Sequence, residues 1–258
     1  MEVSLELVPR SRGGLEAGAF TAARFAEIGY INVPDLARFS IRSWEACGML
    51  AALSPGSGGQ AGFGFIPHLR ARDFLIETPF PYGELFRERG ITRVLVIAGD
   101  PPAETGSAYQ GGIDKETGTV PFIKKLKREF PELEIYAAFD PYRTNIRYEL
   151  DYLREKEDAG ASAFMSQPFF DLRLLEIYAE YLEGKRVFWG TAPVISAGNR
   201  NYWESRNRAV FPRQFRADLD WNIAYGKKLM EFCKGHDFHL YLMPIKVELG
   251  TYLEGLFG

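Results

Sequence analysis

The sequence predicts a single (β/α)8 TIM barrel, an α/β fold in which eight parallel strands alternate with helices. Three observations support this prediction. The chain has 258 residues, close to the roughly 250 residues of a typical barrel of this kind. Short strand-like runs alternate with amphipathic helical segments along its whole length. No break in composition separates two regions, so we expect one barrel domain over residues 1–258.

Eight segments combine apolar and β-branched residues in the way that buried strands require. They are Val3–Val8, Tyr30–Pro34, Phe63–Leu69, Arg93–Ala98, Glu134–Phe139, Ser162–Gln167, Arg186–Ala192 and Phe238–Met243. Helical periodicity lies between them, as in Leu15–Ile28, Ile146–Asp158 and Leu172–Leu182. The polar stretch Ser196–Asp220 instead predicts a long loop and an extra helix on the rim.

The stretch Asp158–Asp171, DAGASAFMSQPFFD, shows one repeat of this fold most clearly. Gly160 can adopt the left-handed conformation that ends a helix. Ser162–Ser166 is a short, mostly apolar run typical of a strand buried on both faces. Pro168 should stop the strand's hydrogen-bond ladder, which places Gln167 at the strand exit. Side chains at the carboxyl ends of barrel strands face the substrate, so Gln167 is a candidate binding residue.

Composition favours a small-molecule site. The 31 basic and 34 acidic residues are interspersed and give a net charge of -3, so we expect neither nucleic acid nor an anionic membrane surface as partner. Cys47 and Cys233 lie outside any CxxC or Cys/His cluster, which predicts buried thiols in a reducing compartment. No signal-peptide pattern and no membrane-spanning apolar run is evident, so a cytoplasmic protein is expected.

Glu6 lies in the apolar alternation Ser4 to Val8 of the first predicted strand. Burial makes a carboxylate costly to ionise and raises its pKa, so Glu6 can hold a proton near neutral pH, as a general acid must. A buried ion pair with a lysine or arginine is the alternative explanation.

Other strand ends carry further candidates. His68 ends the third strand and is a candidate cofactor or substrate contact, although a structural histidine is the alternative. His236 and His239 fall at the opposite end of the barrel, and their spacing fits no ligand motif, so no metal site is expected. Asp100 follows the fourth strand in AGDPP and should project into the barrel mouth. The loop Gly99–Gly118 offers backbone amides to a ligand.

The last third of the chain adds candidates on the rim. Trp203, in the polar stretch, can stack on a flat heterocycle, whereas Trp189 in the seventh strand is expected to pack in the core. Lys246 follows the eighth strand and can meet an anionic substrate tail or simply cap a loop. Lys156 lies on a predicted helix, where a lysine is usually solvated.

Five of these segments together resemble the 5,10-methylenetetrahydrofolate reductase family along nearly the full chain. DAGASAFMSQPFFD is similar to that family's DAGA…TQ-FFD signature, and VSLELVP to its SFEFFPP start. AGDPP resembles its RGD-proline segment, IPHLR its HLT segment and DFHLYLM its closing DFHFYTLN. Each motif is short, but five in the same order make the resemblance specific.

The resemblance implies a folate-linked flavoprotein that reduces the methylene group of methylenetetrahydrofolate to methyl. Hydride would pass from NADH or NADPH to FAD and then to the iminium carbon of the pterin. By position, Glu6 matches the family's general acid, Asp100 the carboxylate near flavin and pterin, and Gln167 the amide that holds the pterin edge. Implied flavin contacts are His68, Gly99, Asp100, Tyr109, Ala138 and Lys156, and implied folate contacts are Asn199, Trp203 and Lys246.

Two departures bear on the cofactor. The family's arginine before Gly-Asp is Ala98 here, and the basic residue expected beside Lys156 is Glu155. Both changes remove positive charge from the expected position of the flavin phosphates. The chain is therefore interpreted as a divergent member whose FAD binding is weakened or lost, with direct hydride transfer from NADH as one consequence.

Two other functions stay open at this stage. One is a folate-binding accessory subunit that needs a partner protein for electron transfer, and the other is a methyl transferase that uses a folate on a similar barrel. Retention of Glu6, Asp100 and Gln167 together favours the reductase, since a pure binder needs no proton donor in an apolar strand. The choice between NADH, NADPH and a protein donor, and between a homo-oligomer and a hetero-complex, also stays open.

Overall fold

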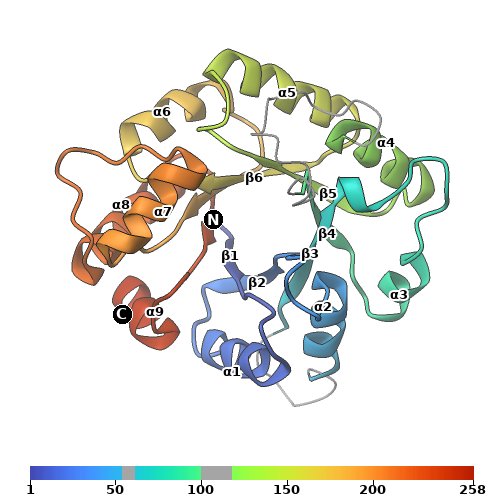
Figure 1. Ribbon diagram of the computed structural model, residues 1–258, viewed down its shortest axis with the longest axis horizontal. Coiled ribbons are helices and arrows are strands. Elements are labelled where there is room, and N and C mark those ends of the chain that lie inside the picture. Colours follow the sequence, from blue (N-terminus) through green and yellow to red (C-terminus); the bar gives the residue numbers. More distant parts are fainter. Residues whose placement is uncertain (54–61, 100–117) are drawn as a thin grey trace.

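The computed structural model describes residues 1–53, 62–99 and 118–258. Its strands form a closed parallel barrel in which each strand pairs with the next and the last pairs with the first. Figure 1 shows the helices arranged around this ring of strands. The strands are β1 (Val3–Glu6), β2 (Ile28–Val33), β3 (Gly64–Arg70), β4 (Arg93–Ile97), β5 (Glu134–Phe139), β6 (Ala163–Pro168), β7 (Val187–Thr191) and β8 (His239–Leu242). The predicted (β/α)8 barrel is confirmed.

The helices lie outside the barrel, as the amphipathic periodicity predicts. They are α1 (Arg12–Ala22), α2 (Ser43–Ala52), the short 3-10 helix η1 (Ala71–Asp73), α3 (Gly83–Glu88), α4 (Thr119–Glu129), α5 (Ile146–Asp158), α6 (Leu172–Tyr181), α7 (Ala197–Asn207), α8 (Leu219–Gly235) and α9 (Leu249–Phe257). The extra rim helix expected in the polar stretch is α7. No helix among the described residues is both long and apolar enough to cross a membrane.

Element ends differ from the predictions in two instructive places. Helix α1 ends at Ala22 rather than continuing to Ile28, because two successive turns intervene: Phe25 N–H donates to Ala22 O, and Ile28 N–H to Phe25 O. Strand β6 continues through Pro168, which pairs with Gly190 after an irregularity in register. The prediction that Pro168 stops the strand was therefore wrong by one residue.

The barrel divides the core into two layers because side chains alternate across a strand. On β4, Val94 and Val96 belong to the outer cluster between strands and helices, whereas Leu95 belongs to an inner cluster. Both cysteines are buried in the outer cluster, and Trp189 is fully buried there, as predicted. Gly160 follows the end of α5 and has a φ of 114°, so the glycine-dependent turn predicted at this position is confirmed.

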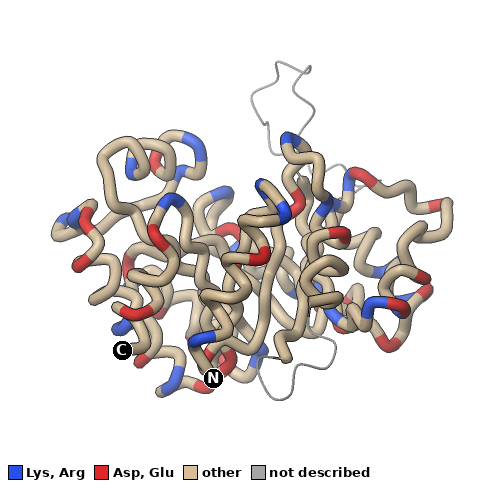
Figure 2. The backbone as a smooth tube through the Cα atoms, turned by 90° about the horizontal axis from the view of Figure 1, so that it is seen from below, with Lys and Arg blue, Asp and Glu red and all other residues tan. Residues whose placement is uncertain are grey.

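Ion pairs join the strands at their amino ends. Arg186 lies 2.7 Å from Glu2 and 3.0 Å from Glu134, and Arg93 lies 2.9 Å from Glu134. We call these four residues the basal ion-pair network. His239 is also at this end, 3.6 Å from Glu2, as expected for a structural histidine. Elsewhere, Figure 2 shows basic and acidic residues interspersed over the outside of the barrel.

Candidate active site

The inner face of the barrel carries polar side chains at the carboxyl ends of the strands. Glu6 alternates with Leu5 and Leu7, which both belong to the outer cluster, so its side chain points inward. The same alternation turns five further residues of the described barrel inward: Asn32 on β2, His68 on β3, Ala138 on β5, Gln167 on β6 and Tyr241 on β8. Four of the predicted site residues, Glu6, His68, Ala138 and Gln167, thus share one end of the barrel, where barrel enzymes bind substrate.

Glu6 has the protonation behaviour predicted from its place in the strand. Burial raises its pKa to about 7, although a hydrogen bond from the Tyr241 hydroxyl to Oε2 opposes the shift. Within the described part of the chain, no lysine or arginine forms an ion pair with it, so the salt-bridge alternative is not supported. A carboxyl group that is half protonated at neutral pH is suited to donate a proton.

His68 forms a buried polar pair with Asn32, a residue that the sequence reasoning missed. Its Nε2 is hydrogen-bonded to Asn32 Oδ1, while Asn32 Nδ2 donates to Met165 Sδ at 3.2 Å. Because the amide oxygen is the acceptor, Nε2 carries the proton of the imidazole. Burial lowers the pKa of His68 to about 3, so the ring is neutral at physiological pH. His68 can orient a ligand by hydrogen bonding but supplies no positive charge.

Gly99 is the last described residue before the predicted carboxylate. Its φ is 85°, and a Cβ there would lie 2.9 Å from Arg70 Nε and 3.1 Å from Arg72 Cγ. A glycine is therefore needed both for the backbone conformation and for the close approach of two arginines. Asp100 and Tyr109, two of the predicted site residues, lie outside the described residues.

Ala138 and Lys156 are brought together, but not in the manner expected of an exposed lysine. The Lys156 ammonium donates to Ala138 O at 2.7 Å and lies 4.0 Å from the ring centre of Tyr152. The residue is 2% exposed, and its burial lowers its pKa to about 8. The interpretation of Lys156 as a solvated surface lysine was wrong, because its long side chain reaches back from α5 to the carboxyl end of β5.

The remaining predicted contacts lie on the rim. Asn199 is in the first turn of α7, half-buried, and its N–H donates to Ser196 Oγ. Trp203 is only 6% exposed and packs edge-on against Phe170, with ring centres 5.5 Å apart. It belongs to the inner apolar cluster rather than forming an open stacking surface. Lys246 is exposed after β8, with a φ of 58°.

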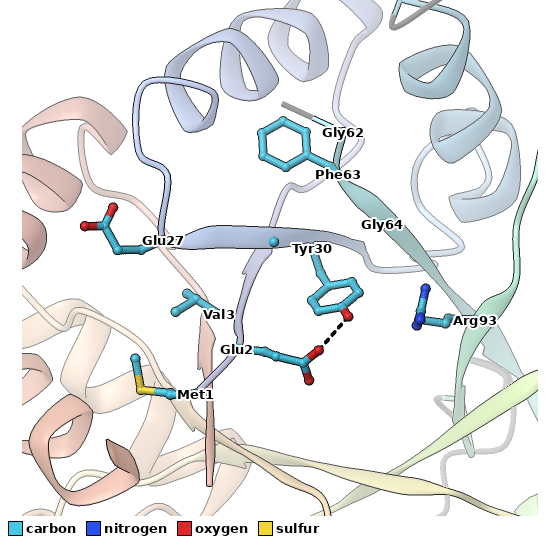
Figure 3. Close-up of a pocket in the computed structure, with 10 residues that line it drawn as sticks. Met1, Glu2, Val3, Glu27, Tyr30, Gly62, Phe63, Gly64 and Arg93 are labelled. Carbon is cyan, nitrogen blue, oxygen red and sulfur yellow. Dashed lines mark hydrogen bonds between the residues drawn. The ribbon is translucent and has the colours of Figure 1, made fainter. Parts of the chain in front are cut away.

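A separate pocket of about 510 Å³ opens at the opposite end of the barrel. Figure 3 shows Tyr30 donating to Glu2 there, with Arg93 on the far side and Phe63 at the edge. These residues precede or begin their strands, so the pocket lies at the amino ends, the end that usually serves stability. The candidate general acid Glu6, together with His68 and Gln167, lies at the carboxyl ends, and we place the candidate site there.

Several solved structures have a similar fold at low sequence identity. Oxaloacetate acetylhydrolase with 3,3-difluorooxalacetate is 14% identical, with a TM-score of 0.62 over 98% of this chain and 78% of that chain. 2,3-Dimethylmalate lyase is 11% identical, with a TM-score of 0.61 over 99% and 78%. A putative deoxyribose-phosphate aldolase from Toxoplasma gondii ME49 is 9% identical, with a TM-score of 0.58 over 99% and 93%. These likenesses establish the fold alone.

A search of curated protein sequences finds no match. The family model of methylenetetrahydrofolate reductase, in contrast, matches residues 62–198, more than half of the 258 residues. The match covers β3 to β7 and includes His68, Ala138 and Gln167. The sequence motifs, the barrel and this match agree: the chain belongs to the methylenetetrahydrofolate reductase family.

Proposed function

We propose that this protein reduces 5,10-methylenetetrahydrofolate to 5-methyltetrahydrofolate, with NADH or NADPH as the hydride donor. The observation that carries the proposal is Glu6, a carboxyl group with a pKa of about 7 at the substrate end of the barrel. Glu6 lies outside the residues that the family model matches. The buried position of Glu6 thus supports the proposed reductase function independently of the family match.

The chemistry requires one proton and one hydride. Glu6 would donate its proton to the ring nitrogen that leaves when the five-membered ring opens, which gives an iminium at the methylene carbon. The hydride, with its electron pair, adds to that carbon, so the folate is reduced and the nicotinamide is oxidised. The amide of Gln167, half-buried and without a hydrogen-bond partner among the described residues, is suited to hold the polar edge of the pterin.

Around Lys156, the described residues offer little free positive charge for the phosphate end of FAD. Phosphates are held by cationic side chains and backbone amides, yet the Lys156 ammonium is buried against Ala138 O and the Tyr152 ring. Ala98 replaces the family's arginine before Gly-Asp, and Glu155 replaces the basic residue expected beside Lys156. His68 is neutral. We therefore infer that FAD binding is weakened or lost and that hydride passes directly from the nicotinamide to the folate.

The test is a turnover assay with the purified protein, with and without added FAD. We expect oxidation of NADH or NADPH only when methylenetetrahydrofolate is present, and mass spectrometry should identify 5-methyltetrahydrofolate as the product. Flavin absorbance that survives desalting would contradict the proposed loss of FAD. A protein that binds folate but never turns over would contradict the reductase itself and favour an accessory subunit.

The substitution Glu6→Gln tests whether Glu6 is the general acid. The amide keeps the shape but cannot donate a proton at the required step, so the turnover number should fall by roughly 10²-fold or more, while folate affinity is retained. Glu27→Gln is the matched control, because it removes one carboxylate at the opposite end of the barrel, in an exposed position. Normal turnover by Glu6→Gln would show that another group is the acid.

A further inference from the structure

The hydroxyl of Tyr241 forms the one hydrogen bond that the described residues provide to the Glu6 carboxyl. Tyr241 is 4% exposed, and its neighbours Leu240 and Leu242 pack in the outer cluster. The ring therefore has to point into the barrel. Its Cα pairs with that of Ser4, two residues before Glu6, so the phenol reaches along the inner face toward the carboxyl ends.

The direction of this hydrogen bond is fixed by chemistry. The phenol is buried beside a carboxyl group, and both conditions raise the pKa of Tyr241 well above its usual value. The phenol therefore stays protonated near neutral pH and can donate a hydrogen bond to Oε2 of Glu6. With Oε2 occupied, Oε1 is the oxygen that can carry a transferable proton toward a substrate.

We propose that Tyr241 is the positioning residue for Glu6: its hydroxyl anchors Oε2 and directs Oε1 to the substrate. The inference rests on the proposed reductase function for its catalytic meaning, but the contact itself does not. A donated hydrogen bond stabilises the ionised form of a carboxyl group, so Tyr241 also limits the rise in pKa that burial causes at Glu6. No charged group of a neighbouring element within the described residues adds to these two effects on Glu6.

Tyr241→Phe removes the hydroxyl and keeps the ring. The probe is the infrared band of the protonated carboxyl, followed against pH in the resting protein and assigned by its absence in Glu6→Gln. We expect the wild-type band to titrate near pH 7 and the Tyr241→Phe midpoint to lie about one to two pH units higher. The basic limb of the kcat/KM profile should move in the same direction, and kcat should fall more than KM changes.

Tyr30→Phe is the matched control. Tyr30 also donates its hydroxyl to a carboxylate, Glu2 Oε1 at 2.7 Å, but at the amino ends of the strands. It should leave both the infrared midpoint and the kcat/KM profile unchanged. If Tyr241→Phe does not fold, Glu6→Asp provides a second variant, since it retracts the carboxyl from the Tyr241 hydroxyl and should also raise the midpoint.

The outcomes separate this inference from the proposed function. An unchanged midpoint in Tyr241→Phe, or an equal shift in Tyr30→Phe, would overturn the role of Tyr241 even if the wild-type protein reduces folate. A shifted midpoint in a protein without reductase activity would support the contact and overturn the proposed function instead.

Discussion

Replacing Arg186 by methionine should destabilise the barrel, because this side chain connects two carboxylates of the basal ion-pair network. It lies 2.7 Å from Glu2 and 3.0 Å from Glu134, and its guanidinium also lies 5.3 Å from the ring centre of Tyr136. Methionine retains much of the apolar stem and removes the charge. The comparison therefore isolates the ionic part of the contact.

The expected loss follows from how exposed the partners are. All three charged side chains are about one-third exposed, at 30% to 35%, so solvent screens each pair and limits it to about 1 kcal/mol. Two pairs and the ring contact together give about 2 kcal/mol. For a chain of this size, that corresponds to a fall in Tm of about 4 to 8 °C.

The destabilisation caused by Arg186→Met should be smaller at acidic pH. Burial raises the pKa of Glu2, but hydrogen bonds from Tyr30 and Arg186 outweigh it and hold the pKa below its usual value. The stabilisation by Arg186 is thus present above the unfolded-state pKa of Glu2 and is lost as the pH falls through the lower, folded-state value. Thermal denaturation of wild type and Arg186→Met at neutral and acidic pH measures the difference.

Arg12→Met is the matched control, since Arg12 pairs with Glu16 on the exposed face of α1. That helical pair should contribute at most about 0.5 kcal/mol. If Arg186→Met were no more destabilising than Arg12→Met, or if its cost stayed constant in acid, the basal ion-pair network would not stabilise the barrel as reasoned here.

Two further substitutions examine the barrel wall and the buried lysine. Gly190→Ala should destabilise the folded protein by about 1 to 3 kcal/mol, because the new Cβ would lie 2.6 Å from Ser166 O and from Met243 Cε. Gly29→Ala is the control, since a Cβ there meets nothing within 4 Å. Chemical denaturation compares the free energies of unfolding of the two variants. Burial lowers the pKa of Lys156 to about 8, from 10.5, so the wild type should gain stability between these pH values and Lys156→Met should lack that gain. Parallel pH profiles for wild type and Lys156→Met would show that burial does not lower the pKa of Lys156 in the folded protein.

The sequence predicted the barrel well because each strand has a local apolar signature. Glu134–Phe139 and Ile146–Asp158 are confirmed at both ends. Helix α1 was predicted too long, since the turns after Ala22 depend on backbone hydrogen bonds that periodicity does not encode. Glu6 was identifiable because a carboxylate inside an apolar strand is unusual.

Other parts of the site depend on contacts between distant positions. Asn32 interrupts an apolar strand much as Glu6 does, and that signal could have identified it. Tyr241 gave no such signal, because tyrosine is common in strands and its partner is 235 residues away. The burial of Trp203 and Lys156 depends on Phe170 and Tyr152, whose proximity no spacing rule predicts.

The pairing of β1 with β8 has a consequence for how the protein is made. During synthesis β1 emerges before β8, so one of its edges has no partner until Leu240 and Leu242 have left the ribosome. The final contacts across that edge include the bond from Leu240 N–H to Glu2 O and the one from Tyr241 to Glu6. The hydrogen bond that limits the rise in the Glu6 pKa is therefore formed only once β8 has joined β1.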